Sequence, residues 1–175
     1  MFKELGHDFE VMAADIDEKK IRSNDIYELP ILVARAKAEA ILPLIKEPSI
    51  LITLDEIVVF KGKILEKPEN KAEAKEVLKS YANEYYETIT GAYVMNTKSN
   101  KVAEGVDVAK VFFKEIPENV INELIEKGNI MNCAGSTEIE DPLLRKYVDR
   151  IEGTAESVAG LPKELVEKLI KEVEN

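Results

Sequence analysis

The chain has little of what disulfide-bonded and histidine-dependent proteins need. Among its 175 residues are one cysteine, one histidine and no tryptophan. Because Cys133 stands alone, an intramolecular disulfide is excluded, and a reducing compartment suits the chain. A Ser-His-Asp triad or a histidine-based zinc site would have to depend on His7 alone. Carboxylates and lysines must therefore carry any chemistry.

The sequence also lacks long apolar runs and an excess of positive charge. No run approaches the roughly 20 apolar residues of a membrane span, and the segment from Met1 to Glu4 is not typical of a signal peptide. We therefore expect a cytoplasmic protein. The net charge of -10 argues against a nucleic acid polymer as partner, because phosphate backbones need a basic face. A single nucleotide, held by a few local cations and a metal, stays compatible with that charge.

Apolar periodicity predicts strands that alternate with helices, with some strands in succession. This order favours an α/β fold, a mixed twisted sheet flanked by helices, within one domain spanning 1–175. The expected helices are a helix tail at Phe2–Leu5 that Gly6 ends, then 26–41, 70–82, 117–128 and a last helix from Pro162; the expected strands are 9–13, 49–54, 57–60, 88–95, 106–113 and 147–151.

The segment most suggestive of chemistry is an acidic strand end. A β-branched run contains Asp55 and Glu56, and a turn framed by Gly62 and Pro68 follows with Lys67. Carboxylates hold divalent metals and activate water, and lysine holds phosphate. The segment therefore indicates a metal-dependent site for a phosphorylated ligand, and an exposed hairpin with surface charges is the alternative.

Two further charged segments join this candidate site. The run Asp15-Ile16-Asp17-Glu18 is a second carboxylate cluster, for which a helix-capping turn is the alternative. Lys37 follows Ala34, Arg35 and Ala36 in the first long helix, where a lone lysine is usually a solvated surface group.

Taken in order, these segments resemble the Maf family of nucleotide pyrophosphatases, of plant type, over nearly the whole chain. The architecture that this resemblance implies is similar to that of inosine triphosphatases. The matching motifs are Leu5-Gly6, Phe9-Glu10-Val11-Met12, Asp15-Ile16-Asp17-Glu18, Ala34-Arg35-Ala36-Lys37-Ala38, Asp55-Glu56-Ile57-Val58-Val59, Lys67-Pro68, Thr90-Gly91, Ala134-Gly135 and Ser157-Val158-Ala159-Gly160-Leu161-Pro162.

The resemblance implies hydrolysis of a nucleoside triphosphate, or a modified nucleotide, to the monophosphate and pyrophosphate. Water would attack the α-phosphate with the help of Mg²⁺ or Mn²⁺, and family members typically form homodimers that remove non-standard nucleotides. Asp55 and Glu18 are then the expected catalytic residues, and Asp55 with Glu56 the expected metal ligands. The expected substrate-binding residues are Lys37, Lys67, Thr90 and Glu140.

Glu140 lies where many members of the family carry glutamine near the base, and a carboxylate there accepts hydrogen bonds from a guanine edge. Relatives that act on 7-methylated GTP carry glutamate at this position, and Cys133-Ala134-Gly135-Ser136 also resembles that branch. This favours a modified purine and leaves UTP and dTTP open.

The chain departs from the family pattern at its start, and at Leu54, Glu56 and Pro30. Family members begin with a strand, a serine loop and an arginine pair, whereas this sequence starts inside the first helix. We expect a chain that is N-terminally truncated relative to the family and has strongly reduced activity, because a helix N-terminus binds phosphate. One alternative function is a catalytically weak or inactive nucleotide-binding or dimerisation paralogue. Another is an inosine-triphosphatase-type enzyme, whose motifs the chain matches less well.

Overall fold

The computed structural model describes residues 8–174, which form two compact units, each built from separate segments of the chain. Unit 1 contains residues 8–56, 89–108 and 155–174, and unit 2 contains 57–88 and 109–154. The expectations for the helix tail at Phe2–Leu5, for Gly6 and for His7 lie outside the described residues. Within residues 8–174, no helix is long and apolar enough to cross a membrane. One domain over the whole chain stays a prediction.

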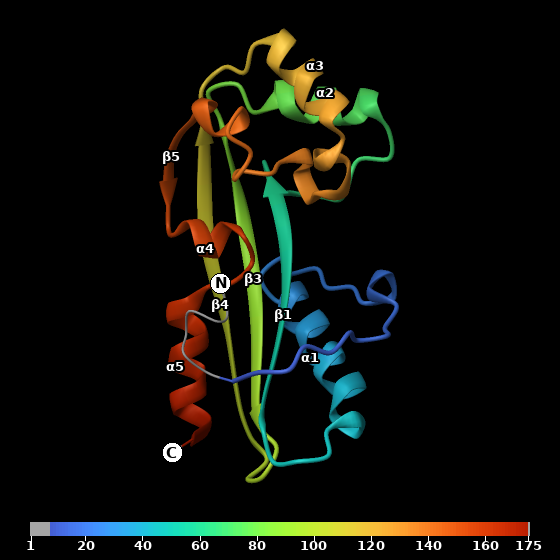
Figure 1. Ribbon diagram of the computed structural model, residues 1–175, viewed down its shortest axis with the longest axis vertical. Coiled ribbons are helices and arrows are strands. Elements are labelled where there is room, and N and C mark those ends of the chain that lie inside the picture. The colour runs from blue at the N-terminus through green and yellow to red at the C-terminus, as the bar shows by residue number, and fades with distance from the viewer. Residues whose placement is uncertain (1–7, 175) are drawn as a thin grey trace. The chain divides into compact units, whose positions relative to one another are not determined.

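The predicted α/β class is confirmed by a five-stranded sheet with flanking helices. The strand order is β2-β1-β3-β4-β5, and the β1–β2 and β4–β5 pairings are antiparallel. The short turn between β3 and β4 also requires an antiparallel pair. Figure 1 shows β1, β3 and β4 as the long strands. The bounds are β1 Ile50–Phe60, β2 Lys63–Leu65, β3 Tyr85–Asn96, β4 Lys101–Phe113 and β5 Val148–Glu152.

The acidic pair does not end a strand, which corrects the sequence prediction. The strands expected at 49–54 and 57–60 are one strand, and Asp55 and Glu56 lie in its middle. The hairpin to β2 begins only after Phe60. Its two turn residues, Lys61 and Gly62, have φ of 49° and 75°, the left-handed conformation that a tight two-residue hairpin requires.

In unit 1, helices cover the two faces of the strands. Helix α1 (Leu29–Ile41) packs through Ala38 and Ile41 on Leu51 and Met95. Helix α5 (Lys163–Glu174) packs on the other face, which carries the alternate residues of the strands. Its cluster contains Ala92, Val94, Ala103, Leu161, Val166, Leu169, Ile170 and Val173, with Ile50, Ile52 and Leu54 against it. Figure 1 shows α1 beside β1 and α5 beside β4.

Unit 1 also contains three shorter helical elements. They are the 3₁₀ turns η2 (Glu18–Lys20) and η3 (Leu42–Leu44) and the short helix α4 (Ala155–Val158). Pro30 occupies the first turn of α1, the one part of a helix in which its missing N–H costs nothing.

Unit 2 is built around a buried aromatic cluster. Tyr81 is fully buried, stacks on Phe113 at 5.4 Å between ring centroids, and meets Phe60 edge-on at 5.1 Å. Helix α2 (Lys71–Ser80) begins at Asn70, whose side chain accepts a hydrogen bond from the Glu73 N–H. The other helical elements are α3 (Glu118–Lys127), η4 (Asn129–Asn132), η5 (Ala134–Ser136) and η6 (Leu144–Tyr147).

One predicted strand is wrong. Residues 9–13 form no strand, and Val11 is 83% exposed. The apolar residues of this segment gave the strand pattern, but a strand also needs a partner that accepts its ladder of hydrogen bonds. Apart from the two predicted strands that are joined in β1, every other predicted element within residues 8–174 is present with shifted ends. Helix α1, for example, begins at Leu29 rather than Ile26.

Candidate functional site

Three charged side chains of unit 1 meet at the middle of β1. Lys37 Nζ lies 2.7 Å from Asp55 Oδ1 and 2.9 Å from Glu18 Oε1. It also donates to the Leu54 carbonyl oxygen at 3.4 Å. The side chains of Asp55 and Lys37 are 12% and 20% exposed, whereas that of Glu18 is 53% exposed. Three residues that the sequence singled out are therefore in direct contact, and the cluster opens to solvent on the Glu18 side.

Strand alternation and helix packing explain this meeting. Asp55 leaves β1 on the same face as Leu51 and Thr53, because side chains two apart in a strand share a face. That face carries α1: Leu51 packs on its apolar side, and Thr53 Oγ1 donates to the Ala34 carbonyl oxygen at 2.7 Å. Lys37, almost one helical turn beyond Ala34, thus reaches Asp55.

The cluster shifts the acidity of two of its members. Burial raises the pKa of Asp55 above its ordinary value, although the hydrogen bond from Lys37 opposes this. Burial also disfavours the Lys37 ammonium, but hydrogen bonds to Asp55 and Glu18 outweigh it, and the Lys37 pKa is raised. Asp55 is therefore a stronger proton acceptor than an ordinary aspartate, and Lys37 keeps its positive charge.

Glu56 lies on the opposite face of β1 from Asp55. Its side chain packs against the backbone of Gly160, where an added Cβ would lie 2.9 Å from Glu56 Oε2. This oxygen is buried and has no hydrogen-bond partner among residues 8–174. Burial raises the pKa of Glu56 to about 8, and the Asp55 charge adds to the effect. A carboxyl group in this setting is neutral at neutral pH.

The opposite positions of Asp55 and Glu56 on β1 decide whether these two carboxylates can bind the same metal ion. Asp55 and Glu56 do not converge, because consecutive residues of a strand point to opposite sides. Asp55 and Glu18 do converge, since an oxygen of each lies within 3 Å of the Lys37 ammonium. These two carboxylates therefore fit a cation better than the predicted pair. Residues 8–174 contain no group of three or more His, Cys, Asp or Glu side chains placed to hold a metal, so an ion here would need water or phosphate oxygens as further ligands.

Thr90 is in the core of unit 1 rather than at a surface. It is 1% exposed, and its Oγ1 has no hydrogen-bond partner within the described part of the chain. Gly91, the next residue, has a clear packing role. A Cβ at Gly91 would lie 2.4 Å from Ile31 N and from the Pro30 carbonyl carbon, so only glycine lets α1 approach β3 this closely. Direct contact of Thr90 with a substrate stays a prediction.

Lys67 lies in unit 2 and lines a hollow of about 390 Å³. Lys67 is exposed and Pro68 beside it is buried. The hollow is lined by Ile64, Leu65, Glu66, Lys67, Pro68, Glu69, Glu73, Val77 and Ser136. It is large enough for a small polar ligand, and Lys67 supplies a cation to its lining.

The core of unit 2 holds the loop that lines this hollow. Tyr81 donates its hydroxyl hydrogen to the Gly135 carbonyl oxygen at 2.9 Å, and the Gly135 N–H donates to the Glu66 carbonyl oxygen at 3.1 Å. Gly135 has φ of 63°, and a Cβ there would lie 2.7 Å from Val58 Cγ1. The predicted Ala134-Gly135 motif therefore has a structural cause, which is close packing against β1.

Glu140 is exposed in the loop after η5. Its neighbour Asp141 is 9% exposed. The Asp141 carboxylate accepts a hydrogen bond from the Leu143 N–H at 2.7 Å and forms an ion pair with Lys127 at 3.1 Å. These contacts fix the loop, so Glu140 is presented on an anchored segment of unit 2.

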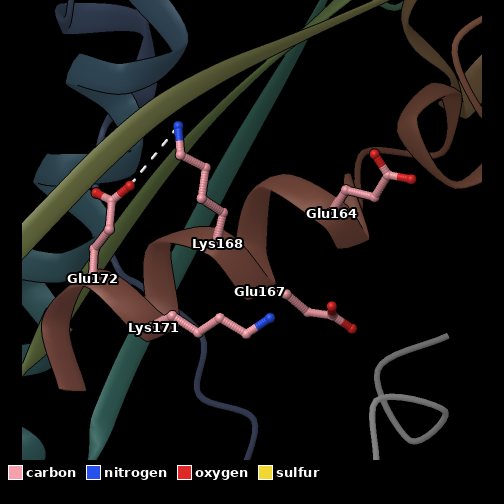
Figure 2. A pocket seen from close by; sticks show the side chains of 5 residues that line it. All are labelled: Glu164, Glu167, Lys168, Lys171 and Glu172. Atoms are coloured by element: carbon pink, nitrogen blue, oxygen red, sulfur yellow. Dashed lines mark ion pairs between the residues drawn. The ribbon is translucent and has the colours of Figure 1, made fainter. Parts of the chain in front are cut away.

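A second hollow, of about 380 Å³, runs along the outer side of α5 (Figure 2). Glu164, Glu167, Lys168, Lys171 and Glu172 line it, and all are exposed. Figure 2 shows the Lys168–Glu172 ion pair, a contact of 3.8 Å between residues four apart. All five belong to one helix and none is a predicted site residue, so we interpret this hollow as the solvated face of α5.

Sequence reasoning did not find two residues that support these sites. Thr53 connects β1 to α1 beside Asp55, and Tyr81 holds the loop beside Lys67. The signal for Thr53 was its spacing of two from Asp55. Tyr81 carried no such signal, because its partner Gly135 lies 54 residues away.

Together, the fold and the Lys37–Asp55–Glu18 cluster define an α/β protein with acid–base groups suited to a phosphorylated ligand. Over residues 1–173 the chain matches the family model described as Maf-like protein. It is 38% identical to the 7-methyl-GTP pyrophosphatase of Dictyostelium discoideum, over 97% of this chain and 89% of the relative. It is 33% identical to a nucleoside triphosphate pyrophosphatase of Synechococcus sp. (99% and 87% covered) and 32% identical to a dTTP/UTP pyrophosphatase of Clostridium tetani (99% and 91% covered). The chain belongs to the Maf-like family.

Proposed function

We propose that this chain is a nucleoside triphosphate pyrophosphatase that releases a nucleoside monophosphate and pyrophosphate. Membership of the Maf-like family and relatives named as pyrophosphatases over nearly the full chain support the proposal. The observation that carries it is the contact of Lys37 with both Asp55 and Glu18. This cluster joins a proton acceptor, a fixed cation and a second carboxylate at one point.

The proposed reaction uses Asp55 as general base. Asp55 accepts a proton from a water molecule whose oxygen attacks the α-phosphorus. The new bond joins that oxygen to the α-phosphorus, and the bond from the α-phosphorus to the oxygen bridging the α- and β-phosphates breaks. Pyrophosphate leaves with the bonding electron pair. Lys37 binds a phosphate oxygen and stabilises the charge that gathers there.

A divalent cation, Mg²⁺ or Mn²⁺, belongs to this proposal. The cluster carries two carboxylates and one ammonium, so its net charge is negative and it repels a triphosphate. Asp55 and Glu18 would hold the ion. When bound, it would supply the positive charge that offsets this repulsion and would increase the acidity of water.

For the base, we propose a modified guanine nucleotide such as 7-methyl-GTP. Glu140 supports this, because an exposed carboxylate accepts hydrogen bonds from the N–H groups of a guanine edge. The 38% identity to the Dictyostelium relative, against 32% to the Clostridium tetani dTTP/UTP pyrophosphatase, agrees with it. Lys67 stays a proposed substrate-binding residue, because it supplies an exposed cation to the lining of the hollow in unit 2. A cytoplasmic homodimer is proposed on the family resemblance alone. Sedimentation equilibrium would measure the mass of the protein in solution and so distinguish a dimer from a monomer.

The test is pyrophosphate release by the purified chain with Mg²⁺, Mn²⁺ or a chelator. The substrates are 7-methyl-GTP, GTP, UTP, dTTP and CTP. Asp55→Asn should abolish release, whereas Asp149→Asn, the same change at an exposed aspartate of β5, should leave it unchanged. Equal turnover by wild type and Asp55→Asn would refute the role of Asp55. Full turnover in chelator would refute the metal, and faster turnover of UTP or dTTP would refute the assigned base.

A further inference from the structure

Helix α1 contacts the strands of unit 1 at three successive points along its length. Near its start, the backbone at Pro30 and Ile31 touches Gly91. One turn on, the Ala34 carbonyl oxygen accepts the Thr53 hydroxyl at 2.7 Å. Almost one turn further, Lys37 reaches Asp55 at 2.7 Å. The first two contacts therefore precede the proposed site and fix how α1 lies on β1.

The Thr53 hydrogen bond has properties of a positioning contact. Thr53 is 7% exposed and Ala34 is completely buried, so water cannot replace the lost partner at low cost. A helix carbonyl oxygen has a second lone pair beyond its intrahelical bond, which the Thr53 hydroxyl uses. Packing alone would tolerate valine at this position, since it has the same shape.

Spacing links this contact to the site. Thr53 and Asp55 lie on one face of β1, about 7 Å apart along the strand. Ala34 and Lys37 are three residues apart, about 4.5 Å along the helix axis. Sliding α1 by one residue would change the axial position by about 1.5 Å and rotate the lysine by about 100°. That shift would take the ammonium away from Asp55.

We propose that Thr53 is a positioning residue for catalysis, which acts by holding α1 in the register that brings Lys37 to Asp55. This inference rests on the proposed function of Asp55 and Lys37. It assigns to the hydroxyl, rather than to the methyl group, a role in the chemical step. The reaction itself is unchanged: Thr53 touches neither the substrate nor the reacting atoms.

The test compares two substitutions at this position. Thr53→Val keeps the shape and removes the hydroxyl, whereas Thr53→Ser keeps the hydroxyl. We expect Thr53→Val to lower kcat for pyrophosphate release about tenfold with KM changed less than about twofold, the size of effect that groups supporting an active-site ligand show. Thr53→Ser should recover kcat to within about threefold of wild type.

A matched control separates positioning from stability. Thr88 is as buried as Thr53, at 2% exposure, but its Oγ1 has no hydrogen-bond partner within the described residues. Thr88→Val should leave kcat unchanged. Thr53→Val is assayed well below its measured Tm, so unfolding does not contribute to the loss.

The outcomes distinguish this inference from the proposed function. Wild type without any pyrophosphate release would refute the proposed function. An active wild type with equal kcat for Thr53→Val would overturn the role of Thr53 alone. Equal losses for Thr53→Ser and Thr53→Val would also overturn it, because the hydroxyl would then not be the group responsible.

Discussion

Substitution of Glu56 by glutamine should make the protein more stable, and increasingly so as pH rises. Glu56 Oε2 is buried against Gly160, and no described residue forms a hydrogen bond with it. Burial raises the pKa of this carboxyl to about 8. Glutamine has the same shape and no charge. The change therefore removes the cost of protonating this carboxyl group when the protein folds and leaves the packing of unit 1 in place.

The pH dependence follows from proton binding. The folded protein keeps the Glu56 proton up to about pH 8, whereas the unfolded chain loses it near 4.5. Between these values the folded state binds more protons, so the unfolding free energy of the wild type falls as pH rises. The shift from 4.5 to about 8 corresponds to at most roughly 5 kcal/mol of unfolding free energy. Because the residue is only partly buried, solvent screening reduces the expected effect to about 2 kcal/mol.

The assay is urea unfolding of wild type and Glu56→Gln at about pH 5 and about pH 8.5. The stability difference between the two proteins should grow by about 2 kcal/mol between these pH values. Glu47→Gln, the same change at an exposed glutamate, should show no such growth. A stability difference between Glu56→Gln and wild type that is constant with pH would show that burial does not raise the pKa of Glu56.

Three further predictions concern Gly91, Lys37 and Lys67. Gly91→Ala should lower the unfolding free energy, measured by urea unfolding, by about 3 kcal/mol, since its Cβ would lie 2.4 Å from backbone atoms of α1. As control, Gly62→Ala should cost only about 1 kcal/mol, because no atom of the described residues lies within 4 Å of its Cβ. Lys37→Met should lower the unfolding free energy by about 2 kcal/mol in the same assay, because Asp55 loses the ammonium group with which it pairs. A stability equal to that of wild type would contradict the contribution of the Lys37–Asp55 ion pair. Lys67→Ala should raise KM about tenfold for the triphosphate in steady-state kinetics, and an unchanged KM would remove Lys67 from the binding site.

Local patterns predicted much of the fold. The helix start at Asn70 and the stop at Gly128 are encoded by a few residues, and both lie where the sequence indicated. Helix α1 begins three residues later than the sequence predicted, with Pro30 in its first turn. The strand predicted at 9–13 was wrong, because apolar residues alone do not supply a neighbouring strand with which to pair. The predicted strand break between Leu54 and Ile57 was wrong for a different reason. The charged pair Asp55 and Glu56 made the middle of β1 resemble the end of a strand, whereas the strand continues to Phe60.

The candidate site was predictable in its residues and less so in its geometry. Order of motifs along the chain selected Lys37, Asp55 and Glu18, which meet in unit 1. The same motifs could not show that Glu56 leaves β1 on the other face, since this depends on the strand continuing through both residues. They also could not find Thr53 or Tyr81, whose hydrogen bonds reach backbone carbonyl oxygens that any residue type provides.

In the proposed reaction, water attacks the α-phosphorus of a nucleoside triphosphate with Asp55 as base. Its most direct test is a single turnover of 7-methyl-GTP in water enriched in oxygen-18, with mass spectrometry of both products and Asp55→Asn as control. We predict that the label enters the nucleoside monophosphate and that the control forms no product. Label in pyrophosphate, or release of orthophosphate in place of pyrophosphate, would contradict attack at the α-phosphorus. Undiminished turnover by Asp55→Asn would contradict the role of Asp55 as base.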